Sequence, residues 1–389
     1  MSFDFDRIID RRNTNSLKYD YAAERGRPKD IQPLWVADMD FAVPAEITAA
    51  IQKTAAHGVF GYSVPSPEYF QILSDSLFKR FSWRPQPEWL CNTPGVVYAL
   101  AMAVKAFTRE NESVIIQQPV YYPFRTVITS NNRRLINSPL VRADGGYIID
   151  FSDFEKKITD NGVKLFILCS PHNPVGRVWT RGELTRLGEI CLKHNVIVVS
   201  DEIHSDFVYP GNKHYTFHTL DDRFLNNTVL CTSPGKSFNL AGLQFSDILI
   251  PNGDLRKRFT AECDKCGYDQ LNIFGIVAAE AAYRYGEPWL AALVAYLEKN
   301  ADFIAGYLKQ NLPQIKYQKP EGTYLAWLDF SALRLSQKEL DRLITYKAGL
   351  WLDSGLIFGA EGAGFQRINF ACPRSVLKEA LDKLTKALS

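Results

Sequence analysis

The sequence has little net charge and no long apolar run. Its 45 basic and 43 acidic residues leave a formal charge of +2, which gives no strong field that would attract nucleic acid or an anionic membrane. Residues 1–6 lack the basic and apolar regions of a signal peptide, and no uninterrupted apolar stretch approaches membrane-spanning length. We therefore expect a cytoplasmic protein that binds neither nucleic acid nor a membrane.

The seven cysteines do not form a pattern typical of disulfide or metal frameworks. Their count is odd, and Cys169 and Cys231 stand in apolar, strand-like runs where buried free thiols are usual. Cys263 and Cys266 form a C-x-x-C pair, a spacing that can bind zinc or do redox chemistry. A second pair is missing, and the charged residues around this one predict a helix. We expect an inert pair, no disulfide framework and no metal site.

Length and apolar content, by contrast, are ample. The 389 residues, 46% of them hydrophobic, exceed what one compact core usually holds. We find no internal repeat and no low-complexity linker. A long amphipathic run over residues 289–312 predicts a helix that bridges to a C-terminal unit. The prediction is a large domain over residues 46–288 and a smaller domain formed by residues 1–45 and 289–389.

Short apolar runs alternate with amphipathic stretches from about residue 95 onward. The runs that look like buried parallel strands are residues 113–116, 164–168, 196–199, 228–230 and 247–250. Between two of them, Leu184, Leu187 and Ile190 recur at the spacing of a helix packed on a sheet. The pattern predicts an α/β fold with helices on both faces of a mostly parallel sheet.

Three polar residues, Asn173, Asp201 and Lys236, each follow one of these runs by a few positions. Ligands of open α/β sheets bind beyond the carboxyl ends of the strands, so the three side chains should converge. Pyridoxal phosphate needs an amine for a Schiff base, a carboxylate at its pyridine nitrogen and a donor to its phenolic oxygen. Each residue also has an ordinary alternative: a surface lysine, a helix-capping aspartate and a turn-forming Asn-Pro.

Three segments carry a resemblance to a known family. They are residues 33–41 (Pro-Leu-Trp-Val-Ala-Asp-Met-Asp-Phe), 200–204 (Ser-Asp-Glu-Ile-His) and 367–374 (Arg-Ile-Asn-Phe-Ala-Cys-Pro-Arg). With the three landmarks, the chain resembles fold-type I pyridoxal phosphate enzymes of the class I/II aminotransferase superfamily over nearly its whole length. More narrowly, it resembles the cystathionine β-lyase, or carbon–sulfur lyase, subgroup. The resemblance implies a mostly parallel seven-stranded sheet in the large domain and a smaller α+β domain.

The resemblance also implies roles around the cofactor ring. Lys236 carries the cofactor and, once released by the substrate amine, removes the Cα proton. Asp201 keeps the pyridine nitrogen protonated, so that the ring can accept electrons. Asn173 donates to the ring oxygen, and His204 lies near the same oxygen. Tyr121 stacks on the ring, with Tyr122 as the alternative.

The phosphate end is assigned in the same way. Backbone N–H groups of Gly95 and Val96, at the start of an apolar helix, cradle the phosphate, and Ser233 adds a hydroxyl. Tyr62 matches a tyrosine that family members contribute to the neighbouring subunit's phosphate, which implies an obligate homodimer; an ordinary loop tyrosine is the alternative. The chain departs from many superfamily members at Gln244, which stands where they carry a phosphate-binding arginine.

For the substrate, Arg367 is expected to clamp the α-carboxylate, because a guanidinium fork fits a carboxylate bidentately and stays charged. Arg374 is the alternative clamp, and the backbone at Ala37 is expected to assist. The resulting hypothesis is α,β-elimination of L-cystathionine or a related S-substituted L-cysteine to pyruvate, ammonia and a thiol. Transamination of an L-amino acid uses the same residues and is the alternative. A regulatory binding role on an enzyme scaffold is a third hypothesis.

Overall fold

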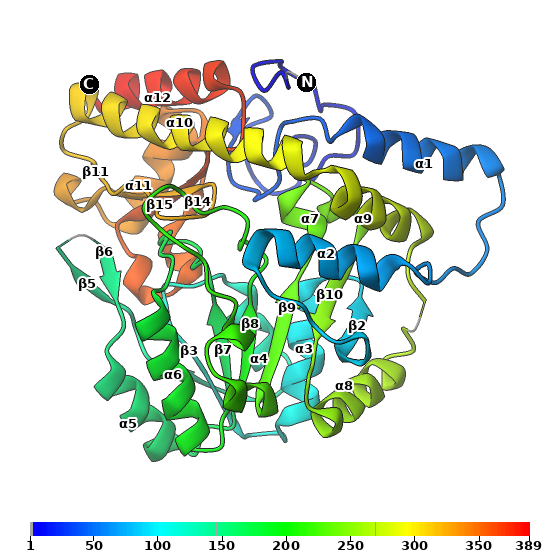
Figure 1. Cartoon of the computed structure of the whole chain (residues 1–389). Coiled ribbons are helices and arrows are strands. Elements are labelled where there is room, and N and C mark those ends of the chain that lie inside the picture. Colours follow the sequence, from blue (N-terminus) through cyan, green and yellow to red (C-terminus); the bar gives the residue numbers. More distant parts are fainter. Residues whose placement is uncertain (1–2, 145, 269) are drawn as a thin grey trace.

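The computed structural model describes residues 3–144, 146–268 and 270–389. Its largest element is a seven-stranded sheet in the order β2-β10-β9-β8-β7-β3-β4 (Figure 1). β10 runs antiparallel to both of its neighbours, and the other paired strands are parallel. The strands are β2 (Leu90–Thr93), β3 (Ser113–Ile116), β4 (Arg134–Asn137), β7 (Leu165–Cys169), β8 (Ile197–Asp201), β9 (Thr228–Thr232) and β10 (Ser246–Leu249).

All five expected strands are present, but one prediction of direction is wrong. The runs at β3, β7, β8 and β9 are confirmed as parallel strands. The run at residues 247–250 forms β10, which is antiparallel to β9. The connection between them, residues 233–245, contains the four-residue helix α7 (Pro234–Ser237) and a three-residue 3-10 helix (Ala241–Leu243), and neither is long enough to return along the sheet. Such a helix spans about 6 Å, against about 16 Å for a five-residue strand, so the chain stays at one edge and turns back.

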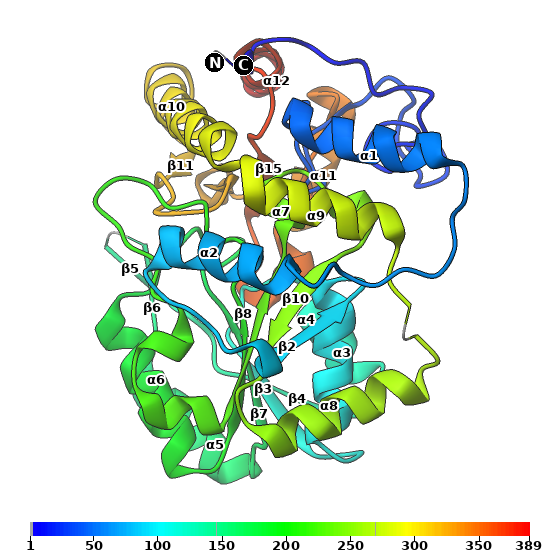
Figure 2. The same cartoon turned by 45° about the vertical axis from the view of Figure 1, so that its right-hand side comes forward.

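Both faces of this sheet are covered, which explains why its central strands are apolar throughout. In β7, Leu165 and Ile167 point to one face, while Phe166 and Leu168 point to the other. The first face packs against α3 (Val96–Phe107), α4 (Pro123–Thr129) and α8 (Gly253–Lys265). The second packs against α5 (Phe151–Asn161) and α6 (Arg181–Lys193), and Figure 2 shows the two groups of helices on opposite sides. The helix that the spacing of Leu184, Leu187 and Ile190 predicts is confirmed as α6.

A third apolar cluster joins the N-terminal segment, several helices and a small sheet. The helices are α1 (Ala45–His57), α2 (Tyr69–Phe81), α9 (Ile273–Tyr285), α10 (Glu287–Asn311) and α12 (Arg374–Leu388). The small antiparallel sheet has the order β11-β12-β15-β14: β11 (Lys316–Tyr317), β12 (Leu325–Asp329), β14 (Asp353–Ser354) and β15 (Phe365–Asn369). The amphipathic run at residues 289–312 is confirmed as α10. The division into two domains stays a prediction.

The N-terminal segment is tied to the C-terminal part by a short parallel pair. β1 (Gln32–Pro33) pairs with β13 (Leu350–Trp351). β5 (Val141–Ala143) and β6 (Gly146–Ile148) pair antiparallel, and α11 (Gln337–Arg342) lies between β12 and β14 in the chain. Within the described ranges, no helix is both long and apolar enough to cross a membrane. The residues just after β1 are thereby held against β15, because the Leu34 and Trp35 carbonyls accept hydrogen bonds from the Asn369 N–H and from Arg367.

Candidate active site

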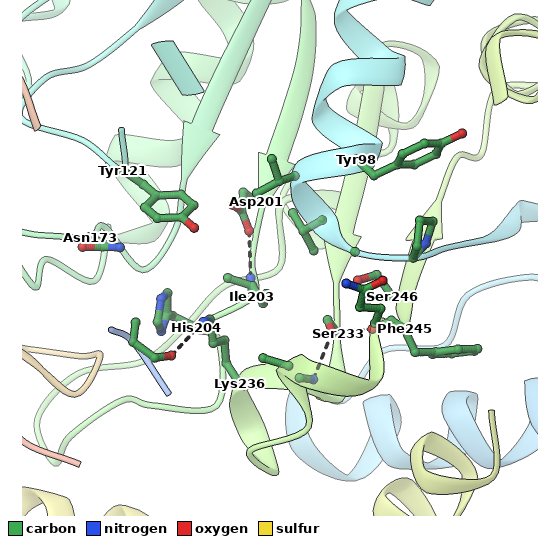
Figure 3. A pocket seen from close by; sticks show the side chains of 18 of the residues that line it. Tyr98, Tyr121, Asn173, Asp201, Ile203, His204, Ser233, Lys236, Phe245 and Ser246 are labelled. Carbon is green, nitrogen blue, oxygen red and sulfur yellow. Dashed lines mark hydrogen bonds between the residues drawn. The ribbon is translucent and has the colours of Figure 1, made fainter. Parts of the chain in front are cut away.

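A cavity of about 410 Å³ lies beyond the carboxyl ends of β7, β8 and β9. Figure 3 shows Tyr121, Asn173 and His204 toward one end and Ser233 and Ser246 toward the other. Nine of the predicted site residues line this cavity: Ala37, Gly95, Val96, Tyr121, Asn173, Asp201, His204, Ser233 and Lys236. The expected convergence is therefore confirmed: Asn173, Asp201 and Lys236 line one cavity.

Lys236 sits on α7, a single helical turn that is fixed by the side chain of Ser233. The Ser233 Oγ accepts a hydrogen bond from the Gly235 N–H (2.9 Å) and donates to the Phe245 carbonyl (2.7 Å). The Lys236 Nζ donates to the Ala37 carbonyl (2.7 Å). Burial lowers the pKa of Lys236 to about 8. An amine with that pKa is neutral in roughly a tenth of molecules at pH 7, against about one in 3,000 for an ordinary lysine.

Asp201 ends β8 as a buried carboxylate that bonds no cation in the described part of the chain. Its Oδ1 accepts one hydrogen bond, from the Ile203 N–H (3.1 Å). Burial raises the pKa of Asp201 to about 7, although the backbone bond and the charge of Lys236 act the other way. A buried carboxylate without a cation is costly, and a protonated ring nitrogen beside it would lower that cost.

His204 is on the segment that follows β8 and lines the same cavity as Asp201. It is buried, its Nδ1 has no hydrogen-bond partner among the described residues, and burial lowers its pKa to about 3. The imidazole is therefore neutral at ordinary pH, and its unpartnered nitrogen is available to an oxygen of a bound molecule. Its expected position near the ring oxygen stays a prediction.

The other end of the cavity presents N–H and O–H donors. α3 begins at Val96 after Gly95, so the first N–H groups of this twelve-residue helix have no partner within it. The Ser246 Oγ is buried and lacks a partner in the described structure. Ser233, in contrast, already donates its hydroxyl proton to Phe245, so its predicted bond to a phosphate would have to replace that one. Gln244 also lines this end.

Arg367, on β15, reaches the cavity edge through Asn173. Its Nη1 donates to the Asn173 Oδ1 (2.9 Å), and its Nη2 donates to the Trp35 carbonyl (2.8 Å) and forms an ion pair with Asp353. Because Asn173 accepts through its oxygen, its amide nitrogen is left for another acceptor. Arg374 instead donates to Asn300 (2.6 Å), so Arg367 is the arginine that is joined to the cavity.

The three tyrosines considered in the sequence analysis differ in exposure. Tyr121 is largely buried in the cavity wall, whereas Tyr122 is 39% exposed and does not line it. Tyr62 is 93% exposed, on the connection between α1 and α2, together with the exposed Val59 and Val64. Tyr62 does not reach the cavity of its own chain.

Sequence reasoning missed Ser246 and Asp353. Neither follows a motif: Ser246 is the first residue of β10, and Asp353 contacts Arg367 only because β14 pairs with β15.

At the C-x-x-C pair, Cys263 lies in the last turn of α8 and Cys266 caps it, so the expected helix is confirmed. In the described residues there is no group of three side chains suited to a metal ion.

Taken together, the donors and acceptors of the cavity fit pyridoxal phosphate. The buried, unpaired Asp201 suits a protonated ring nitrogen, Tyr121 provides a flat face, and Lys236 provides an amine that is partly neutral. The free N–H groups at the start of α3 and the Ser246 hydroxyl suit phosphate oxygens. The fit lacks a cation at the phosphate end, because Gln244 is neutral.

The chain is similar to known proteins over its whole length. The model of the family described as aminotransferase class I and II matches residues 30–384. Cystathionine beta-lyase PatB of Bacillus subtilis is 44% identical over 385 residues, which cover 99% of this chain and 100% of PatB. Among solved structures, cystalysin of Treponema denticola, which contains pyridoxal 5'-phosphate, has a TM-score of 0.96 at 40% identity and covers 100% of this chain and 99% of its own. The PLP-bound C-S lyase of Staphylococcus hominis has a TM-score of 0.93 at 34% identity and covers 100% of this chain and 98% of its own.

Proposed function

Because the chain belongs to the aminotransferase class I and II family, we propose that it is a pyridoxal phosphate-dependent carbon–sulfur β-lyase. Its substrate is L-cystathionine or a related S-substituted L-cysteine, and its products are pyruvate, ammonia and a thiol. The observation that carries the proposal is one cavity that joins the partly neutral amine of Lys236, the unpaired carboxylate of Asp201 and, through Asn173, the fork of Arg367. The relatives named cystathionine beta-lyase and C-S lyase support elimination as the outcome.

When bound, the cofactor supplies an electron sink for the pair left at the substrate Cα. Lys236 takes the Cα proton, and its lowered pKa means that the amine is available as a base near neutral pH. Asp201 holds a proton at the ring nitrogen, with which it would form a charge-assisted hydrogen bond. Tyr121 would pack against the ring and Asn173 would donate its amide N–H to the ring oxygen, so that both would orient the cofactor.

The substrate is held at its carboxylate by Arg367. The guanidinium is fixed in place by Asn173, Asp353 and the Trp35 carbonyl, so little conformational entropy is lost when a carboxylate binds. With the α-carboxylate held by Arg367, Lys236 would be the group that takes the Cα proton. A sulfur substituent at Cβ then departs readily, because a thiol has a pKa near 8.5 and is a far stronger acid than an alcohol.

We also propose that the enzyme is a homodimer in which Tyr62 completes the partner's phosphate site. Support comes from its 93% exposure, from the exposed apolar residues around it and from the missing cation at Gln244. A cytoplasmic location is part of the same proposal. It is supported by the free state of all seven cysteines.

The proposal is tested by incubating the purified holoenzyme with L-cystathionine and measuring pyruvate and free thiol in the same samples. We expect equal amounts of both products, and none from a Lys236→Ala variant that still folds. Thiol without pyruvate, or equal turnover by the variant, would contradict the proposal.

A further inference from the structure

Arg25 is an exposed cation whose guanidinium has no hydrogen-bond or ion-pair partner in the described residues. It lies over the ring of Trp35, 5.3 Å from the ring centroid. Trp35 in turn stacks on Trp351 with a centroid distance of 4.4 Å and an interplanar angle of 11°, and Arg27 lies over Trp351. Arg27 also donates to the Thr345 hydroxyl (2.8 Å). The aromatic stack therefore places Arg25 and leaves all of its N–H donors open.

The same stack belongs to the edge of the active site. The carbonyl of Trp35 accepts a hydrogen bond from Arg367, the proposed carboxylate clamp, so one residue contacts both guanidinium groups. The charges of both arginines act on the pKa of Tyr122, which is half-exposed at this rim. Burial raises the pKa of the Tyr122 hydroxyl and Asp353 adds to the rise, while the charges of Arg367 and Arg25 oppose it. Arg25 thus lies close enough to the rim to act on groups there.

The cations inside the site are already in use. Arg367 holds the α-carboxylate in the proposed function, Lys236 is the base, and the imidazole of His204 is neutral. A substrate with a second carboxylate would therefore find Arg25 as the open guanidinium at the rim. A second donor lies beside it, because the Trp35 Nε1 is buried and has no partner within the described structure.

We propose that Arg25 binds the distal carboxylate of the substrate, so that the preferred substrates are thioethers whose leaving thiol is itself an amino acid. This inference rests on the proposed function. L-cystathionine has such a distal carboxylate, whereas S-methyl-L-cysteine has only the α-carboxylate. Arg25 is then a specificity residue, because it affects how strongly the substrate binds and does not contact the reacting atoms.

The test compares both substrates on the wild-type holoenzyme and on Arg25→Met, Arg25→Lys and Lys29→Met variants. Lys29 is a matched control, because it is an exposed cation on the same segment and does not lie on the aromatic stack. Pyruvate release gives kcat and KM, and the visible absorbance of the bound cofactor reports that each variant is loaded. For Arg25→Met we expect KM for L-cystathionine to rise roughly fivefold, the upper range for one exposed charge pair.

The kinetic constants of the two substrates should respond differently to Arg25→Met. KM for S-methyl-L-cysteine and kcat for both substrates should stay within error, Arg25→Lys should recover part of the loss, and Lys29→Met should match the wild type. The inference is overturned if Arg25→Met affects both substrates equally or neither, or if Lys29→Met has the same effect. If the wild-type enzyme releases pyruvate from neither substrate, the proposed function itself fails, a result distinct from an active enzyme that is indifferent to Arg25.

Discussion

The lowered pKa of Lys236 predicts how the apoenzyme takes up its cofactor at different pH values. Only the neutral amine can attack the cofactor aldehyde, so the initial loading rate should follow the neutral fraction of Lys236. With a pKa of about 8, that fraction rises about twofold between pH 8 and pH 10. An ordinary lysine, with a pKa of 10.5, would give a rise of roughly 75-fold over the same interval.

The window from pH 8 to pH 10 is chosen because Asp201, with its pKa raised to about 7, is already ionised there. Below it, loading should slow by about 50-fold from pH 8 to pH 6 as Lys236 becomes protonated. The assay follows the visible absorbance of cofactor added to apoenzyme in buffers without primary amines. A Lys236→Ala apoenzyme provides the baseline.

A second variant tests the cause of the shift. The positive charge of Arg367 lowers the pKa of Lys236 further, so Arg367→Gln should raise that pKa and move the plateau of the loading rate to higher pH. The reasoning is refuted if the wild-type rate climbs about tenfold per pH unit from 8 to 10, or if the Arg367→Gln profile moves to lower pH.

Two further predictions follow from the contacts of the site. Asp353→Asn removes the ion-pair partner of Arg367. Steady-state kinetics should show that KM for L-cystathionine rises about tenfold, with a smaller change in kcat. An unchanged KM would mean that Asp353 does not position Arg367. Tyr62→Ala and Lys236→Ala homodimers should each be nearly inactive. Subunit exchange between them should restore about a quarter of wild-type pyruvate release, because half of the dimers are then mixed and each mixed dimer has one of its two sites intact. No recovery would place Tyr62 outside the partner's site.

Much of the large sheet could be predicted from sequence, because strands covered on both faces read as continuous apolar runs. The runs at β3, β7, β8 and β9 are of this kind. The direction of β10 could not be predicted in this way, because an apolar run has the same composition in either direction. Only the structure of the connection, in which α7 is too short to return along the sheet, shows why the chain turns back.

Some residues of the candidate site could be predicted from the sequence, and others could not. Asn173, Asp201 and Lys236 were predictable because each follows a strand, and parallel strands bring their carboxyl ends together. Arg367 was suggested only by a family motif, and its partner Asp353 by nothing in the sequence, since the contact depends on the register of β14 with β15. Ser246 was missed for the same reason: its unpartnered hydroxyl is a property of packing.

The most direct test of the proposed lyase activity is the dependence of L-cystathionine turnover on an α-keto acid acceptor. Elimination regenerates the loaded enzyme in every cycle, so we predict continued release of pyruvate and thiol at the same rate with and without the acceptor. Transamination leaves the amino group on the cofactor, so turnover that stops after about one equivalent per site and resumes only with the acceptor would contradict the account.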